Sequence, residues 1–202
     1  MLADSGAGVP RGEEGSAAPV GGSAALRLLT VGHSNRSLAD FLALLAAHQV
    51  EVVADVRRYP SSRRHPQFEG SALERALGEA GIGYVHVVEL GGMRLARPDS
   101  PHTALAADLF RGYADHMASP EFARGVARLL ELAAAKRTAA MCAEADPAHC
   151  HRSLLADALL ARGRAVAHIV DGGPAHPHRL HARARNEGGT LVYDGAQGRL
   201  PL

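Results

Sequence analysis

The sequence lacks several features that would direct a protein to a particular compartment or partner. Its 202 residues contain no apolar run long enough to cross a membrane and no secretory apolar region, so we expect a soluble, cytoplasmic protein without a membrane partner. It has only two cysteines, and structural disulfides are uncommon in the cytoplasm. Its formal net charge is +1, so any attraction to nucleic acid must come from local clusters of charge.

Lysine is nearly absent, since Lys136 is the only one and arginine supplies the other basic residues. Arginine is the better bidentate ligand for phosphate, but a GC-rich genome would also explain an excess of arginine, alanine and glycine. We attribute the overall excess to the genome and assign function only to arginines that occur in clusters.

The chain divides into a leader, a domain and a tail. Residues 1–24 are rich in Gly, Ala, Ser and Pro without periodicity, which is typical of a disordered leader. Residues 25–202 are expected to form one domain, with an irregular tail rich in His, Arg and Gly from about residue 172. Within that tail, residues 191–193 could add an edge strand to the sheet.

Short apolar segments alternate with segments of helical periodicity in this domain. The predicted strands cover residues 26–32, 50–56, 82–90, 138–141 and 165–170. Five helices are predicted. The first is capped by Ser37, and the second is capped by Ser71 and ends at Gly81. The third and fourth cover residues 104–117 and 120–136, and the fifth ends at Gly163. This alternation favours an α/β fold, a single three-layer α/β/α domain with a mostly parallel sheet.

Polar and ionisable residues stand where the predicted strands end. They are His33, Ser34 and Asn35, Asp55 and Arg57, Glu89, Cys142 and Glu144, and His168 and Asp171. Because the carboxyl ends of parallel strands share one edge of a sheet, we expect these side chains to meet there, where open α/β sheets bind ligands. Burying so many polar groups is costly, so the pattern indicates a functional site.

Asp55 and Glu144 are the predicted catalytic carboxylates, because each ends an apolar strand. A carboxylate there can activate water or stabilise a cationic, sugar-like transition state. The alternative is a salt bridge to a nearby arginine. We favour the salt bridge for Asp55, which precedes Arg57 by two residues. For Glu144 the sequence supports the catalytic role and the salt bridge equally.

A loop rich in arginine follows the second predicted strand. Its basic and aromatic residues are Arg57, Arg58, Tyr59, Arg63, Arg64, His65 and Phe68. Clustered arginines with interleaved aromatic rings suit a phosphate backbone and a stacked base. The alternative is a solvated basic loop that pairs with nearby acids, but the polar strand ends beside it favour an anionic ligand.

Both cysteines lie in residues 141–152, among His149, His151 and Arg152. Cys150 near a helix start has the electropositive surroundings of a nucleophile, although a half-buried structural thiol is the favoured interpretation. Cys142 is expected to be a small core residue. These cysteines and histidines could bind zinc by residue type, but their spacing matches no known finger or ribbon, so we predict no metal and no cofactor.

Taken together, these segments resemble the bacterial domain-of-unknown-function family 488 (DUF488). The motifs that carry the resemblance are Thr30–Ser34, Asp55–Arg57, Pro60–Arg63, Pro66–Phe68, Leu90–Arg94, Cys142–Glu144 and Cys150–Arg152. The resemblance covers about residues 28–171, and the full ordered set is specific although no single motif is decisive. It implies a site built from these strand ends, and an association with glycosidase action on 5-hydroxymethyl pyrimidines in DNA.

We therefore expect a nucleic-acid-directed hydrolase, most concretely a DNA glycosylase that excises a modified pyrimidine such as 5-hydroxymethyluracil from DNA. The catalytic candidates are Glu144, Asp55 and His151. The candidates for substrate binding are His33, Ser34, Arg57, Arg63, Arg64, Phe68, Cys150 and Arg152. The alternatives are a cysteine-dependent phosphatase or sulfurtransferase that uses Cys150, and a non-catalytic module that binds an anion or nucleic acid.

Overall fold

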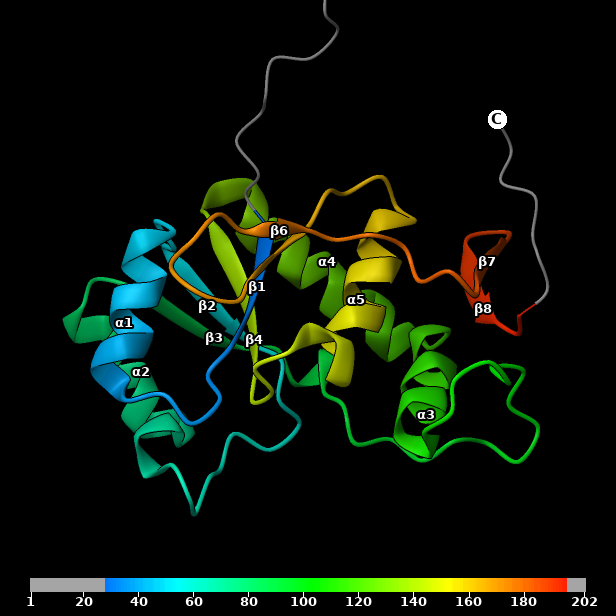
Figure 1. The fold of residues 1–202 in the computed structure, drawn as a ribbon, viewed down its shortest axis with the longest axis horizontal. Coiled ribbons are helices and arrows are strands. Elements are labelled where there is room, and N and C mark those ends of the chain that lie inside the picture. The colour runs from blue at the N-terminus through cyan, green and yellow to red at the C-terminus, as the bar shows by residue number, and fades with distance from the viewer. Residues whose placement is uncertain (1–27, 196–202) are drawn as a thin grey trace, which may run out of the picture.

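A six-stranded sheet forms the centre of the computed structural model, which describes residues 28–195 (Figure 1). The predicted leader lies outside the described residues. The strands are β1 (Leu28–Gly32), β2 (Val52–Asp55), β3 (Gly83–His86), β4 (Thr138–Cys142), β5 (Ala167–Ile169) and β6 (His176–Pro177). Their order is β3-β2-β4-β1-β5-β6, in which all neighbours run parallel except β6, which is antiparallel to β5. The expected α/β fold with a mostly parallel sheet is confirmed.

Helices cover both faces of this sheet (Figure 1). They are α1 (Leu38–Ala47), α2 (Gly70–Glu79), α3 (Asp108–Met117), α4 (Pro120–Ala135) and α5 (Arg152–Leu160). In β4, Ala139 and Met141 pack in the core beneath α1 and α2, whereas Ala140 and Cys142 pack beneath α3, α4 and α5. This alternation follows from the two-residue period of a strand, and it explains why β4 is apolar throughout.

Local sequence sets the helix starts. Ser37 caps α1, because its hydroxyl accepts a hydrogen bond from the Asp40 backbone N–H at 3.1 Å. The predicted cap at Ser71 is wrong, since the cap of α2 is Glu69, two residues earlier, whose carboxylate accepts hydrogen bonds from the backbone N–H groups of Ser71 and Ala72. A carboxylate at this position also complements the positive end of the helix dipole.

Several predicted elements are shorter in the structure, including the strands expected over residues 50–56 and 165–170, which cover Val52–Asp55 and Ala167–Ile169. The strand expected over residues 82–90 ends at His86, because its neighbour β2 ends at the paired residue Asp55. A short 3-10 helix, η2 (Val88–Leu90), follows it. The helix expected from residue 104 begins only at Asp108.

The tail is more ordered than predicted. Residues 191–193 belong to β8 (Thr190–Tyr193), which pairs with β7 (Ala184–Glu187) in a separate hairpin rather than at the edge of the main sheet. Gly188 and Gly189 form its turn with φ of 58° and 94°, a region that glycine adopts without strain. The buried Asp157 of α5 holds the tail, since its carboxylate accepts hydrogen bonds from the Tyr193 hydroxyl at 2.9 Å and from His178 at 2.8 Å.

Candidate active site

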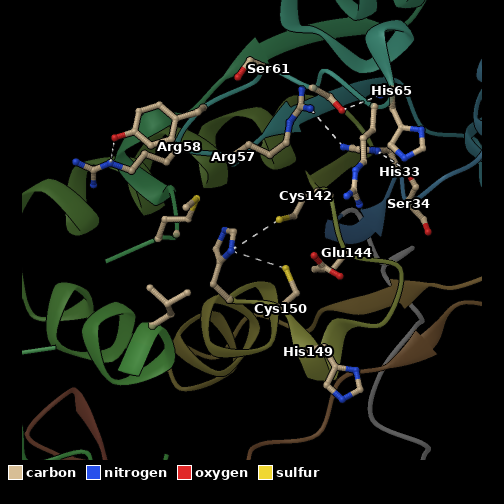
Figure 2. A pocket seen from close by; sticks show the side chains of 18 of the residues that line it. His33, Ser34, Arg57, Arg58, Ser61, His65, Cys142, Glu144, His149 and Cys150 are labelled. Carbon is tan, nitrogen blue, oxygen red and sulfur yellow. Dashed lines mark hydrogen bonds between the residues drawn. The ribbon is translucent and has the colours of Figure 1, made fainter. Parts of the chain in front are cut away.

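A cavity of about 720 Å³ opens at the carboxyl edge of the sheet (Figure 2). Its walls come from the ends of β1, β2 and β4, the arginine-rich loop, the start of α3 and the segment between β4 and α5. Eight predicted site residues line it: His33, Ser34, Arg57, Arg63, Arg64, Glu144, Cys150 and His151. Asp55, Phe68 and Arg152 do not line it. A cavity of this size can hold a nucleotide-sized ligand.

The carboxylate of Asp55 lies below the cavity in a fully buried clamp. Arg57 donates to it from Nη2 at 2.6 Å and from Nε at 2.9 Å, and the Tyr84 hydroxyl donates at 2.8 Å. Burial is the largest single effect on Arg57 and opposes its charge, but the hydrogen bond to Asp55 and the negative charge of Asp55, with smaller effects of Tyr84 and Cys142, together raise the pKa of the guanidinium. Burial, followed by the Asp55 charge, raises the pKa of Tyr84. The salt-bridge interpretation of Asp55 is confirmed, and its oxygens are occupied rather than turned toward a substrate.

His33 forms part of the cavity wall as a neutral ring. Its Nδ1 donates to the Ser34 carbonyl at 2.9 Å, so Nε2 carries no proton and accepts from Nη1 of Arg57 at 3.3 Å. Burial lowers the pKa of His33 to about 4. The ring stacks on Phe68 with centroids 4.2 Å apart, and Phe68 is fully buried. Phe68 therefore supports His33 from the core, which corrects its predicted role of stacking on a base.

Glu144 is the only carboxylate among the described residues that line the cavity. The backbone around it is held on two sides. On one side, Nη2 of Arg152 donates hydrogen bonds to the carbonyls of Glu144 at 2.7 Å and Ala145 at 3.2 Å. On the other side, the backbone packs directly against Gly32, where an added Cβ would lie 1.7 Å from the Glu144 carbonyl oxygen. The Ser34 backbone N–H donates to the Ala143 carbonyl at 2.8 Å, which continues the β1–β4 pairing into this loop. The exposed side chain of Glu144 thus projects from a fixed backbone.

Arg152 has a structural role instead of the predicted role in phosphate binding. Its side chain is fully buried, and its hydrogen bonds go to backbone carbonyls of the Glu144 loop. The basic groups at the cavity come instead from the loop after β2, where Arg63 and Arg64 are exposed and line the opening. Within residues 28–195, neither of these two guanidinium groups makes a hydrogen bond or an ion pair with a protein group.

Tyr59 and the half-buried Phe110 are the phenyl rings that line the cavity, and the exposed Tyr59 has the position that the sequence predicts for Phe68. The Tyr59 ring is 61% exposed and is approached by the guanidinium of Arg58, whose Cζ lies 5.8 Å from the ring centroid. Both residues line the cavity. The signal was present in the sequence, since Tyr59 stands between the arginines of the same loop.

The two thiols lie side by side in the wall and differ in acidity. A hydrogen bond from Cys150 lowers the pKa of Cys142 to about 7, despite burial, and the charge of Arg152 contributes. The same contact with Cys142, together with burial, raises the pKa of Cys150 to about 12. The contact between the two thiols therefore favours negative charge on Cys142 over negative charge on Cys150. Cys142 was expected only in the core, but it also lines the cavity because it ends β4 at the ligand-binding edge.

His151 packs between these thiols and the end of β2. Its Nε2 donates to the Val56 carbonyl at 3.1 Å, and its Nδ1 lies 3.8 Å from each sulfur atom. Both ring nitrogens therefore have partners inside the protein, so neither is free for the catalytic role predicted for His151. His149, one residue before Cys150, is exposed and pairs with Asp146 instead.

Comparison with known proteins places this geometry in a family. The family model described as "Domain of unknown function DUF488" matches residues 37–159, more than half of the chain, so the protein belongs to this family. No curated protein and no solved structure matches the chain. Among residues 28–195, no helix is both long and apolar enough to cross a bilayer.

Proposed function

We propose that this DUF488 protein is a hydrolase acting on nucleic acid, most concretely a DNA glycosylase that releases a modified pyrimidine such as 5-hydroxymethyluracil. One observation carries the proposal. Among the residues that the structure describes, one carboxylate, that of Glu144, lines a nucleotide-sized cavity, and Arg63 and Arg64 at its opening have no hydrogen-bond or ion-pair partner. The acid that would otherwise neutralise the site, Asp55, is fully engaged with Arg57 and Tyr84.

The charge distribution suits a phosphate backbone outside and a sugar inside. Arg63 and Arg64 are exposed at the opening, where guanidinium groups can hold phosphates in bidentate fashion. An enzyme that acts on a base of duplex DNA must extrude that base into a pocket, and the exposed ring of Tyr59 offers a stacking surface beside it.

Glu144 then has the chemistry that the reaction requires. As the glycosidic C1′–N1 bond breaks, its electron pair leaves with the base and positive charge develops on the sugar, which a nearby carboxylate stabilises. Glu144 orients a water molecule for attack at C1′ and takes its proton, so that a hydroxyl group is added to the sugar. That proton neutralises the departing base. Ser34 and Asn35 line the same cavity and offer polar groups to the base edge.

A screen of purified full-length protein against duplex and single-stranded oligonucleotides tests the proposal. Each oligonucleotide carries one modified pyrimidine, and abasic sites are scored by alkaline cleavage. We expect release of 5-hydroxymethyluracil or a related base but not of thymine. Tight binding without abasic sites across the whole panel would instead identify a non-catalytic binding module.

The arginines are tested separately from the chemistry. Arg63→Gln combined with Arg64→Gln removes two exposed guanidinium groups that make no hydrogen bond or ion pair within residues 28–195, so folding is expected to be unchanged. The slope of log affinity against log salt concentration should fall by about 1 to 2, as expected when two phosphate contacts are lost. Arg124→Gln with Arg128→Gln, on the exposed face of α4, is the matched control. An equal effect of both pairs would contradict phosphate binding at the cavity.

A further inference from the structure

Three potential metal ligands converge on the floor of the cavity from different elements. Cys142 ends β4, Cys150 follows the short helix η3 (Pro147–His149), and His151 precedes the first turn of α5. Their ligand atoms all lie within 4.8 Å of one another, and all three residues line the cavity. Figure 2 shows Cys142 and Cys150 directing their sulfur atoms toward the same point. We propose that these residues form a binding site for a thiophilic divalent cation, best suited to Zn²⁺.

The distances fit such an ion. With Zn–S of about 2.3 Å and Zn–N of about 2.0–2.1 Å, tetrahedral geometry places sulfur and nitrogen ligands about 3.5–3.6 Å apart. Nδ1 of His151 lies 3.8 Å from the sulfur atoms of both Cys142 and Cys150. Closing this small difference requires only slight side-chain rotations. A set of two cysteines and one histidine is also a known composition for zinc sites that keep a fourth position for water or substrate.

The hydrogen bonds around the cluster prepare the ligands. The Val56 carbonyl can only accept, so Nε2 of His151 carries the ring proton, and the lone pair of Nδ1 is directed to the sulfur atoms. Metal-binding histidines are oriented in this way by a carbonyl on the opposite nitrogen. The Arg152 backbone N–H donates a hydrogen bond to the Cys150 sulfur at 3.5 Å, which orients that sulfur at the start of α5.

Gly92 keeps the space beside the histidine nitrogen open. A Cβ added there would lie 2.6 Å from Nδ1 of His151, too close for any side chain. Three protein ligands leave one tetrahedral position, and because all three line the cavity, that position faces the space in which Glu144 also lies. The fold therefore brings together three metal ligands whose spacing in the sequence matches no known zinc motif. His149, the fourth candidate by residue type, is not part of this set because its ring pairs with Asp146.

Metal binding can be measured without substrate, so the result of the metal titration does not depend on whether the protein has the proposed hydrolase activity. Full-length protein is freed of metal with a chelator, kept reduced and titrated with Co²⁺. We expect saturation at one ion per chain, with the sulfur-to-cobalt charge-transfer absorption in the near ultraviolet, the intense visible bands of four-coordinate cobalt, and loss of both on addition of Zn²⁺. Cys142→Ser and Cys150→Ser should each weaken binding at least about tenfold, because each removes one thiolate ligand.

The matched control is His149→Ala, which removes a neighbouring imidazole that lies outside the cluster and should bind Co²⁺ like the unaltered protein. Circular dichroism of each serine variant establishes that it is folded. The proposal is overturned if the folded protein shows no thiolate-to-cobalt absorption. It is equally overturned if the serine variants bind as tightly as the control, or if the two thiols form a disulfide under the same reducing conditions.

Discussion

The stability of the fold is expected to fall as the pH drops from 7 to 5, because several histidines of the described residues are buried with lowered pKa values, and the shifts are large for His33 and His168. His33 and His168 are 3% and 7% exposed, and burial lowers the pKa of each to about 4 from an ordinary value of 6.5. Neighbouring groups oppose protonation further, since Arg57 lies beside His33, and His178 lies beside His168 at 2.9 Å.

The direction in which the free energy of unfolding changes with pH follows from the number of protons that the folded and unfolded chains bind. Between pH 6.5 and pH 4, the unfolded chain binds protons on these two rings that the folded chain does not, so the free energy of unfolding decreases as the pH falls through this window. The pKa difference corresponds to about 3 kcal/mol for each ring over the whole window, and access of water near the cavity reduces this to about 2 kcal/mol. By pH 5, the combined loss should be about 2 to 3 kcal/mol.

Urea unfolding at a series of pH values, followed by circular dichroism, measures this slope. His168→Gln retains hydrogen-bonding capacity but cannot be protonated, so it should flatten the dependence by about one proton, whereas substitution of the exposed His149 by Gln should leave it unchanged. A free energy of unfolding that is constant between pH 7 and pH 5 would contradict this prediction, because it would mean that both rings are protonated without cost in the folded state.

Three further predictions concern single contacts. Gly32→Ala should cost at least about 1–3 kcal/mol in urea unfolding, because its Cβ meets the backbone of the loop after β4, whereas Gly78→Ala on open helix surface should stabilise by about 0.5–1 kcal/mol. Tyr193→Phe should cost about 1.5–3 kcal/mol, because the buried Asp157 loses a hydrogen bond, and an unchanged urea midpoint would contradict this. Tyr59→Ala should leave the melting temperature unchanged but weaken single-stranded DNA binding by about 1–3 kcal/mol in fluorescence anisotropy, and equal affinity would exclude stacking on this ring.

The location of the site could be predicted from sequence because it depends on a local rule. Polar residues that directly follow apolar strands must lie at the carboxyl edge of a parallel sheet, and eight of the eleven candidates line one cavity there. The Asp55–Arg57 ion pair could be predicted for the same reason, since the two residues are close neighbours in the chain at one strand end.

The candidates that do not line the cavity depend on contacts between distant parts of the chain. Arg152 has an electropositive local setting, but its burial follows from the turn at Glu144, whose backbone also packs closely against Gly32 of another strand. Phe68 stands in a polar loop, and only the packing of His33 and Phe41 around it places it in the core. Likewise, the cluster of Cys142, Cys150 and His151 has no recognisable spacing, because the strand end and the helix start bring its members together.

The proposed hydrolysis by Glu144 in the arginine-lined cavity is measured as the single-turnover rate of base release from a 5-hydroxymethyluracil oligonucleotide. Glu144→Gln preserves the size of the side chain and removes its charge, and Asp146→Asn, in the same loop but outside the cavity, is the control. We expect Glu144→Gln to lower the rate by about a hundred- to ten-thousand-fold with undiminished DNA affinity, and Asp146→Asn to retain it. Base release by Glu144→Gln at the rate of the control would contradict the account.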